Sequence, residues 1–172
     1  MRTKKLTTFA LLGALAVTLS YLEFLIFPAE MLPVGVRIGL SNLATTFAAY
    51  ALGAPAAFAV TLIKVAFTFF MRGTAAAWMS LCGGLCATAV IALAVRHIDK
   101  AISYVGVSLL AATAHNLGQL AAAMLLSGTA ALFHYGKWLL LFAIPTGFVM
   151  GAVLNLLLPR IPLGFPMKRK GE

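Results

Sequence analysis

Long apolar runs, separated by short polar or turn-forming breaks, follow one another along the whole chain. A transmembrane helix needs about 20 apolar residues to cross a bilayer, and six runs come near that length. The predicted spans cover residues 6–27, 37–53, 56–71, 76–95, 103–126 and 138–158. The pattern therefore predicts an all-α integral membrane protein, with six transmembrane helices in a single transmembrane domain over residues 1–172.

The breaks between the runs have the chemistry of helix ends. Gly53-Ala-Pro55 predicts a tight turn, because glycine permits positive φ and proline ends helices. Arg72-Gly-Thr74 interrupts the third run, and the polar stretch Arg96-His-Ile-Asp-Lys100 separates the fourth run from the fifth. The second and third spans are short, so we expect each of them to be tilted or to end within the membrane interface.

Lysine and arginine are distributed unevenly between the two sides that six spans define. Positively charged residues concentrate on the cytoplasmic side of membrane proteins. With both termini in the cytoplasm, that side holds Arg2, Lys4, Lys5, Arg96, Lys100, Arg160, Lys168, Arg169 and Lys170. The opposite side holds Arg37, Arg72 and Lys137. This bias predicts six spans with both termini cytoplasmic.

The beginning of the chain imitates a secretory signal, since Met1-Arg-Thr-Lys-Lys5 precedes apolar residues. The apolar run continues to Phe27, however, and no small-x-small cleavage site follows it. We therefore expect a retained first helix.

Composition agrees with lipid as the solvent of this chain. Hydrophobic residues make up 62% of it and charged residues 10%, whereas a soluble domain carries roughly a quarter charged residues. The net charge of +9 lies in short clusters between apolar runs and not on a basic face with interleaved aromatic residues. We therefore expect no nucleic-acid partner.

Small residues recur at a spacing of four, at Ala10 and Ala14 and again at Gly147 and Gly151. Such pairs let two helices approach closely. The partner helix can belong to the same bundle or to another protein, and spacing alone favours packing within the bundle.

Charged residues within a membrane usually face a cavity or an oppositely charged partner. Lys64 lies roughly midway along the third predicted span. Two roles stay open for it: a salt bridge inside the bundle, for which Glu23 of the first span is a candidate, and a charge for an anionic ligand.

Two arginines lie at the outer ends of predicted spans. Arg37 begins the second span with Ser41 on the same helix face and Asn42 beside it, and Arg72 ends the third span. Snorkelling towards lipid phosphates is the simpler interpretation of both arginines, and the mouth of a binding cavity is the alternative.

The segment His115-Asn-Leu-Gly-Gln119 places three hydrogen-bonding side chains near the middle of the fifth span. His115 and Gln119 are one turn apart on one face, and Asn116 lies next to it. Buried polar groups need partners, so these side chains either tie helices together or line a polar pocket. The cluster, together with Lys64 and Asn42, favours the pocket.

Several catalytic signatures are missing from the sequence. Asp99 is the one aspartate, so no aspartate-rich motif can hold Mg²⁺ against a diphosphate. No nucleotide-binding loop of the G-x-x-x-x-G-K type occurs. Cys82 and Cys86 share a helix face without further ligands nearby, and we interpret them as packing residues. We expect no catalytic activity, no metal and no cofactor.

Several segments together resemble the Gx transporter family, which is also labelled heptaprenyl diphosphate synthase component I. They are Ala10-Leu-Leu-Gly-Ala14, Leu19-Ser-Tyr-Leu-Glu23, Val36-Arg-Ile-Gly-Leu-Ser-Asn42, Cys82-Gly-Gly84, Gly106-Val-Ser108 and Ala114-His-Asn-Leu-Gly-Gln119. The resemblance covers nearly the whole chain. The family is similar to the substrate-binding S components of energy-coupling factor (ECF) vitamin transporters.

This resemblance implies a six-helix S-component fold with a substrate cavity open to the outside. It also implies that the Ala10 and Ala14 face docks on a transmembrane scaffold subunit, which two ATPase subunits drive. From the resemblance and the polar residues we predict a substrate-binding subunit of an ECF/ABC-type importer in a bacterial cytoplasmic membrane. Its ligand would be a small nutrient, anionic or vitamin-like. The predicted binding residues are Arg37, Asn42, Lys64, Arg72, His115, Asn116 and Gln119.

Two alternatives stay open. A membrane accessory of polyprenyl diphosphate synthesis would associate with a soluble aspartate-rich synthase. A purely structural membrane subunit would have no cavity at His115.

Overall fold

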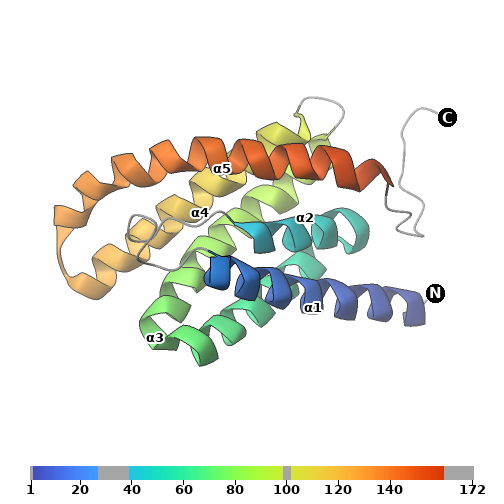
Figure 1. The fold of residues 1–172 in the computed structure, drawn as a ribbon, viewed down its shortest axis with the longest axis horizontal. Helices are drawn as coiled ribbons and strands as arrows, with labels where there is room; N and C mark the ends of the chain where they lie inside the picture. The colour runs from blue at the N-terminus through green and yellow to red at the C-terminus, as the bar shows by residue number, and fades with distance from the viewer. Residues whose placement is uncertain (1, 27–38, 99–101, 161–172) are drawn as a thin grey trace.

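The computed structural model describes residues 2–26, 39–98 and 102–160, and within them the fold is helical (Figure 1). The long helices are α1 (Arg2–Ile26), α2 (Leu40–Leu52), α3 (Ala54–Ala94), α4 (Tyr104–Ser127) and α5 (Gly136–Leu157). Short 3-10 helices cover Val95–His97, Ala130–Tyr135 and Leu158–Arg160. The described residues form no β-strand, so the all-α prediction is confirmed.

Four helical segments are long and apolar enough to cross a membrane: Thr3–Ile26, Ala54–Ala94, Tyr104–Ser127 and Ala130–Leu157. The chain is therefore a multi-pass membrane protein. Helix α2 has 13 residues, which is short for a bilayer core of about 30 Å at 1.5 Å per residue. The predicted span over residues 37–53 is thus shortened to Leu40–Leu52, and residues 37 and 38 lie outside the described residues.

Helix α3 turns back on itself at Gly73. The backbone there has φ 80° and ψ −177°, a conformation that glycine adopts without the steric cost of a Cβ. The hydroxyl oxygens of Thr61 and Thr88 lie 2.6 Å apart, so the two arms of the helix pack against each other, and Figure 1 shows the turn in green. The predicted spans 56–71 and 76–95 correspond to these arms, but the break between them is one residue and not a loop.

Different helix ends lie at the two ends of the long axis of the bundle. Figure 1 shows the start of α1 and the end of α5 at one end of the long axis, and the connection between α4 and α5 at the other. The turn at Gly53 has φ 94° and is followed by Pro55 in the first turn of α3, as the sequence predicts.

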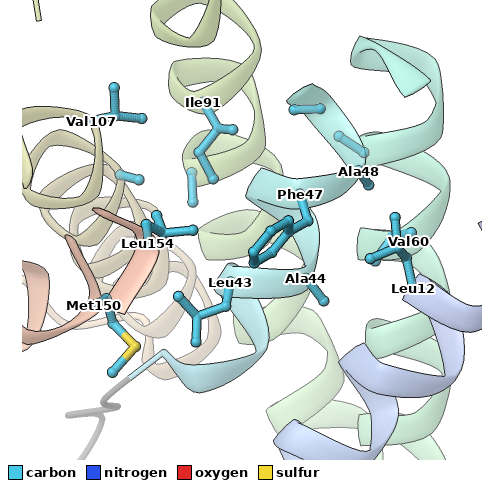
Figure 2. Packing of buried hydrophobic residues seen from close by; sticks show 14 of the residues in the cluster. Leu12, Leu43, Ala44, Phe47, Ala48, Val60, Ile91, Val107, Met150 and Leu154 are labelled. Atoms are coloured by element: carbon cyan, nitrogen blue, oxygen red, sulfur yellow. The ribbon is translucent and has the colours of Figure 1, made fainter. Parts of the chain in front are cut away.

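Helix α2 lies in the middle of the bundle, against α1 and the first arm of α3 (Figure 1). Most of its residues are buried, among them the run from Leu43 to Ala49. Figure 2 shows Phe47 and Leu43 of α2 on the side that faces Leu154 of α5, with Val60 of α3 on the other side. Most of α2 is therefore covered by the other helices, although the helix itself is short.

Close approach of helices depends on the glycines of α5 and α4. A Cβ added at Gly147 would come within 2.8 Å of the Leu109 Cα, and one at Gly151 would meet the Cα of Val105. The packing interpretation of this glycine pair is confirmed. Because lipid tails are as apolar as the core, such contacts and not the hydrophobic effect hold helices together in a membrane.

Candidate functional site

A small open cleft lies between α2, α4 and α5. Its polar lining comes from Asn42 and Thr46 of α2 and from Ser108 of α4, and Met150 and Leu154 of α5 supply apolar lining. The space available to the centre of a water molecule is about 20 Å³, which is enough for about one water molecule. A larger ligand would therefore require α2 and α5 to move apart.

Asn42 connects this cleft to the buried lysine of α3. The Lys64 Nζ donates a hydrogen bond of 2.9 Å to the Asn42 Oδ1, and Lys64 is only 4% exposed. An ammonium group removed from water needs such acceptors. The structure thus brings together two of the predicted binding residues, and one of them lines the cleft.

The carboxylate of Glu23 meets the beginning of α2. Its two oxygens accept hydrogen bonds from the backbone N–H groups of Gly39, at 2.9 Å, and Leu40, at 3.1 Å. The first N–H groups of a helix lack intrahelical partners and carry partial positive charge, so a carboxylate stabilises them. The sequence offered Glu23 as a salt-bridge partner for Lys64, and this capping role was not foreseen.

A signal for this capping role exists in the sequence. Helix α2 begins after Gly39, which has φ 82° and makes no side-chain cap. A helix without a Ser, Thr, Asp or Asn at its N-cap needs an acceptor from elsewhere. The acidic residue at position 23 is the one in the first predicted span.

The three polar residues of α4 are buried but point to different neighbours. Asn116 donates a 2.7 Å hydrogen bond from its Nδ2 to the Leu139 carbonyl oxygen of α5. His115 packs against Gly83 of α3, where an added Cβ would lie 3.3 Å from the imidazole ring. Gln119 is 4% exposed, and its Oε1 has no hydrogen-bond partner among the described residues. None of the three is among the residues that line the cleft described above.

Neither arginine of the predicted site can be assigned to this arrangement from the described residues. Arg37 lies outside the described residues. Arg72 is exposed beside the Gly73 turn, with its guanidinium carbon 5.5 Å from the centre of the Phe24 ring. This is a cation–π contact within the chain, and it leaves both interpretations of Arg72 open.

Two polar residues of the cleft, Thr46 and Ser108, are not among the predicted binding residues. Thr46 donates a hydrogen bond of 2.9 Å to the Asn42 carbonyl oxygen, and Ser108 lies across the cleft on α4. Single Ser and Thr residues are common in transmembrane helices because they can bond to the backbone one turn earlier. Thr46 and Ser108 differ from other Ser and Thr residues of the chain only in lying close to Asn42 in the folded structure.

Helix α1 presents two different faces. Leu12 and Ala16 are buried against the bundle, whereas Ala10 and Ala14 are exposed among the described residues. The spacing of the alanines favoured packing within the bundle, and their exposure contradicts that interpretation. This face of α1 is thus exposed in the described part of the chain.

These features define the class of the molecule: a multi-pass helical membrane protein with a small, partly polar cleft beside a buried lysine. The family model described as heptaprenyl diphosphate synthase component I matches residues 12–157, so the chain belongs to this family. The family named from the sequence is thereby confirmed. No curated protein and no solved structure matches the chain significantly.

Proposed function

We propose that the chain is the substrate-binding subunit of an ECF/ABC-type importer in a bacterial cytoplasmic membrane. In this proposal the two arms of α3 and the short helix α2 count as separate membrane segments, which together with α1, α4 and α5 makes six. The shared end of α1 and α5 in Figure 1 and the bias of Lys and Arg support a topology with both termini in the cytoplasm.

The observation that carries this proposal is the hydrogen bond between the Lys64 ammonium and the Asn42 side chain at the cleft. A charged residue inside a membrane is costly and is by default a candidate for a ligand or ion site. An anionic small molecule would meet Asn42, Thr46 and Ser108 first, with the charge of Lys64 directly behind Asn42. The other predicted residues that the structure describes (Arg72, His115, Asn116 and Gln119) would contribute only after the helices rearrange.

The exposed alanines of α1 support docking on a second protein. Ala10 and Ala14 leave a shallow strip on which another helix can approach closely. In the proposal this partner is the transmembrane scaffold, and the ATPase subunits bound to it supply the energy. The chain itself would capture the substrate, catalyse nothing and need no cofactor.

One experiment separates this function from the others. The chain is expressed in bacterial cells and purified in mild detergent, and mass spectrometry identifies the proteins and small molecules that are retained. Co-purification of ATPase subunits supports the importer, and their loss in the Ala10→Leu/Ala14→Leu variant, with the bundle still folded, assigns the docking face. The matched control is Leu11→Ala, which changes an exposed α1 residue without filling the strip. Retention of no ATPase subunit in either detergent or native nanodiscs would reject the proposal.

The family's description favours a second function, as a membrane accessory of heptaprenyl diphosphate synthesis. In that case a soluble aspartate-rich synthase would co-purify in place of the ATPases. Asn42→Ala and Lys64→Met would then leave prenyl transfer by that synthase unchanged, whereas the importer loses its retained small molecule in both variants.

A further inference from the structure

The buried carboxylate of Glu23 connects helix α1 to the first turn of α2. It belongs to α1, whose opposite face carries the exposed Ala10 and Ala14. Glu23 is 8% exposed, and both of its oxygens are used by the backbone of Gly39 and Leu40. Burial of a carboxylate in a membrane protein is costly, so its two backbone hydrogen bonds are a specific arrangement and not an incidental contact.

The backbone that Glu23 holds is also part of the cleft. Gly39 and Asn42 both line it, and the Asn42 N–H donates a hydrogen bond of 2.8 Å to the Gly39 carbonyl oxygen. The Asn42 side chain lies close over Gly39, because a Cβ added there would be 3.2 Å from the Asn42 Nδ2. A shift of Gly39 therefore moves Asn42, and Asn42 in turn bonds Lys64.

We propose that Glu23 is a positioning residue for the cleft: its carboxylate fixes the first turn of α2 and so transmits the position of α1 to Asn42. A displacement of α1 would pull on the backbone of Gly39 and Leu40 and change the cleft without any direct contact between α1 and a ligand. The use of the cleft for a substrate rests on the function proposed above. The coupling of α1 to Asn42 through Glu23 does not depend on that function.

The test measures the cleft without a ligand or a partner protein. Ser108→Cys places a thiol on the α4 side of the cleft, in a background that carries Cys82→Ala and Cys86→Ala. The rate of modification by N-ethylmaleimide is measured by mass spectrometry on the full chain in detergent. Ser127→Cys, at the exposed end of α4, reports general loosening. Hydrogen exchange of the peptide that contains Gly39 and Leu40 is followed in parallel.

Glu23→Ala removes both acceptors of the α2 amides. We expect it to raise the S108C modification rate and the exchange of the Gly39 peptide by roughly tenfold or more, since each lost bond involves a charged acceptor. The S127C rate should stay unchanged. Glu23→Asp keeps the charge and both oxygens on a shorter side chain. Its S108C modification rate should be closer to the rate measured with Glu23 in place. Thr8→Ala, which removes another hydrogen bond of α1, should have no effect on S108C.

Three results would overturn the proposal: an unchanged S108C rate in folded Glu23→Ala protein, equal increases at S108C and S127C, or no rescue by Glu23→Asp. If Glu23→Ala does not fold, Glu23→Gln decides, because it keeps one acceptor oxygen and should give a smaller increase in the same direction. A positive result without any co-purified ATPase would reject the importer and leave the positioning role intact.

Discussion

The two sides of α4 and α5 are built on different principles. Where α4 packs on α5 and on the second arm of α3, glycines bring the backbones into contact, as Gly147 does on Leu109 and Gly118 on Cys82. Where α2 approaches the same two helices, a cleft remains. There α2 is held from its other side, by Glu23 and by Lys64. We call the tightly packed interface of α4 with α5 and α3 the closed seam, because backbone contacts at glycines hold it together. We call the interface on the α2 side the bonded side, because a few hydrogen bonds hold α2 in place and each can be removed by one substitution.

The closed seam should respond most strongly to added volume. In Gly151→Ala the new methyl group meets the Val105 backbone, which cannot move without displacing α4. We expect a loss of about 2–3 kcal/mol of stability, measured as SDS or thermal unfolding in detergent. Gly13→Ala is the matched control, since its Cβ meets only the flexible end of Ile63, at 3.2 Å. Equal losses in both variants would contradict the claim that backbone contact closes the interface between α4 and α5.

On the bonded side, loss of the hydrogen-bond acceptor of Lys64 should destabilise the fold. Asn42→Leu removes the oxygen that accepts from the buried Lys64 ammonium, and a hydrogen bond to a charged group contributes about 1.5–3 kcal/mol. We expect Asn42→Leu to cost about 2 kcal/mol and Lys64→Met to cost less, because the second change also removes the buried charge. A double-mutant cycle measures the coupling, and additive effects would show that the two side chains act independently.

A single hydrogen bond across the closed seam should matter less than its packing. Asn116→Ala removes the bond to the Leu139 carbonyl oxygen, and interhelical bonds of this kind contribute about 0.6 kcal/mol on average in membrane proteins. We expect a destabilisation of about 0.5–1.5 kcal/mol in the same unfolding assay. Asn155→Ala changes an exposed position of α5, so its stability should equal that of the parent within error. A larger effect would show that Asn155 makes a stabilising contact.

The smallest effect on stability is expected outside both the closed seam and the bonded side. Ala10→Leu/Ala14→Leu changes only exposed positions of α1, so the isolated chain should keep its stability within about 0.5 kcal/mol. Association with the proposed scaffold should nevertheless be lost, as measured by co-purification. A strongly destabilised variant would mean that these alanines pack within the chain after all.

The sequence predicted the helices better than the site, for a physical reason. Hydrophobic runs and the glycines at positions 53 and 73 are local signals, so the all-helical membrane fold and both turns could be predicted. In a helix that is apolar all round, however, periodicity does not separate the face that meets lipid from the face that meets protein.

The polar cluster of α4 illustrates this limit. His115 and Asn116 are adjacent in sequence, but in a helix consecutive side chains point about 100° apart, so one packs on α3 and the other bonds α5. Likewise Glu23 and Lys64 were paired by opposite charge alone, whereas the free N–H groups at the start of α2 offer the carboxylate a second kind of partner. Which of these partners a polar group chooses depends on helix placement, which no short motif encodes.

The shortness of α2 has a consequence for how the protein enters the membrane during its synthesis. A segment of 13 residues that includes Ser41, Asn42, Thr45 and Thr46 is too short and too polar to leave the translocon for lipid on its own. The neighbouring helices that bury it must therefore be present when it inserts. We therefore expect α2 to enter the bilayer only together with helices that cover it, which in the folded chain are α1, α3 and α5.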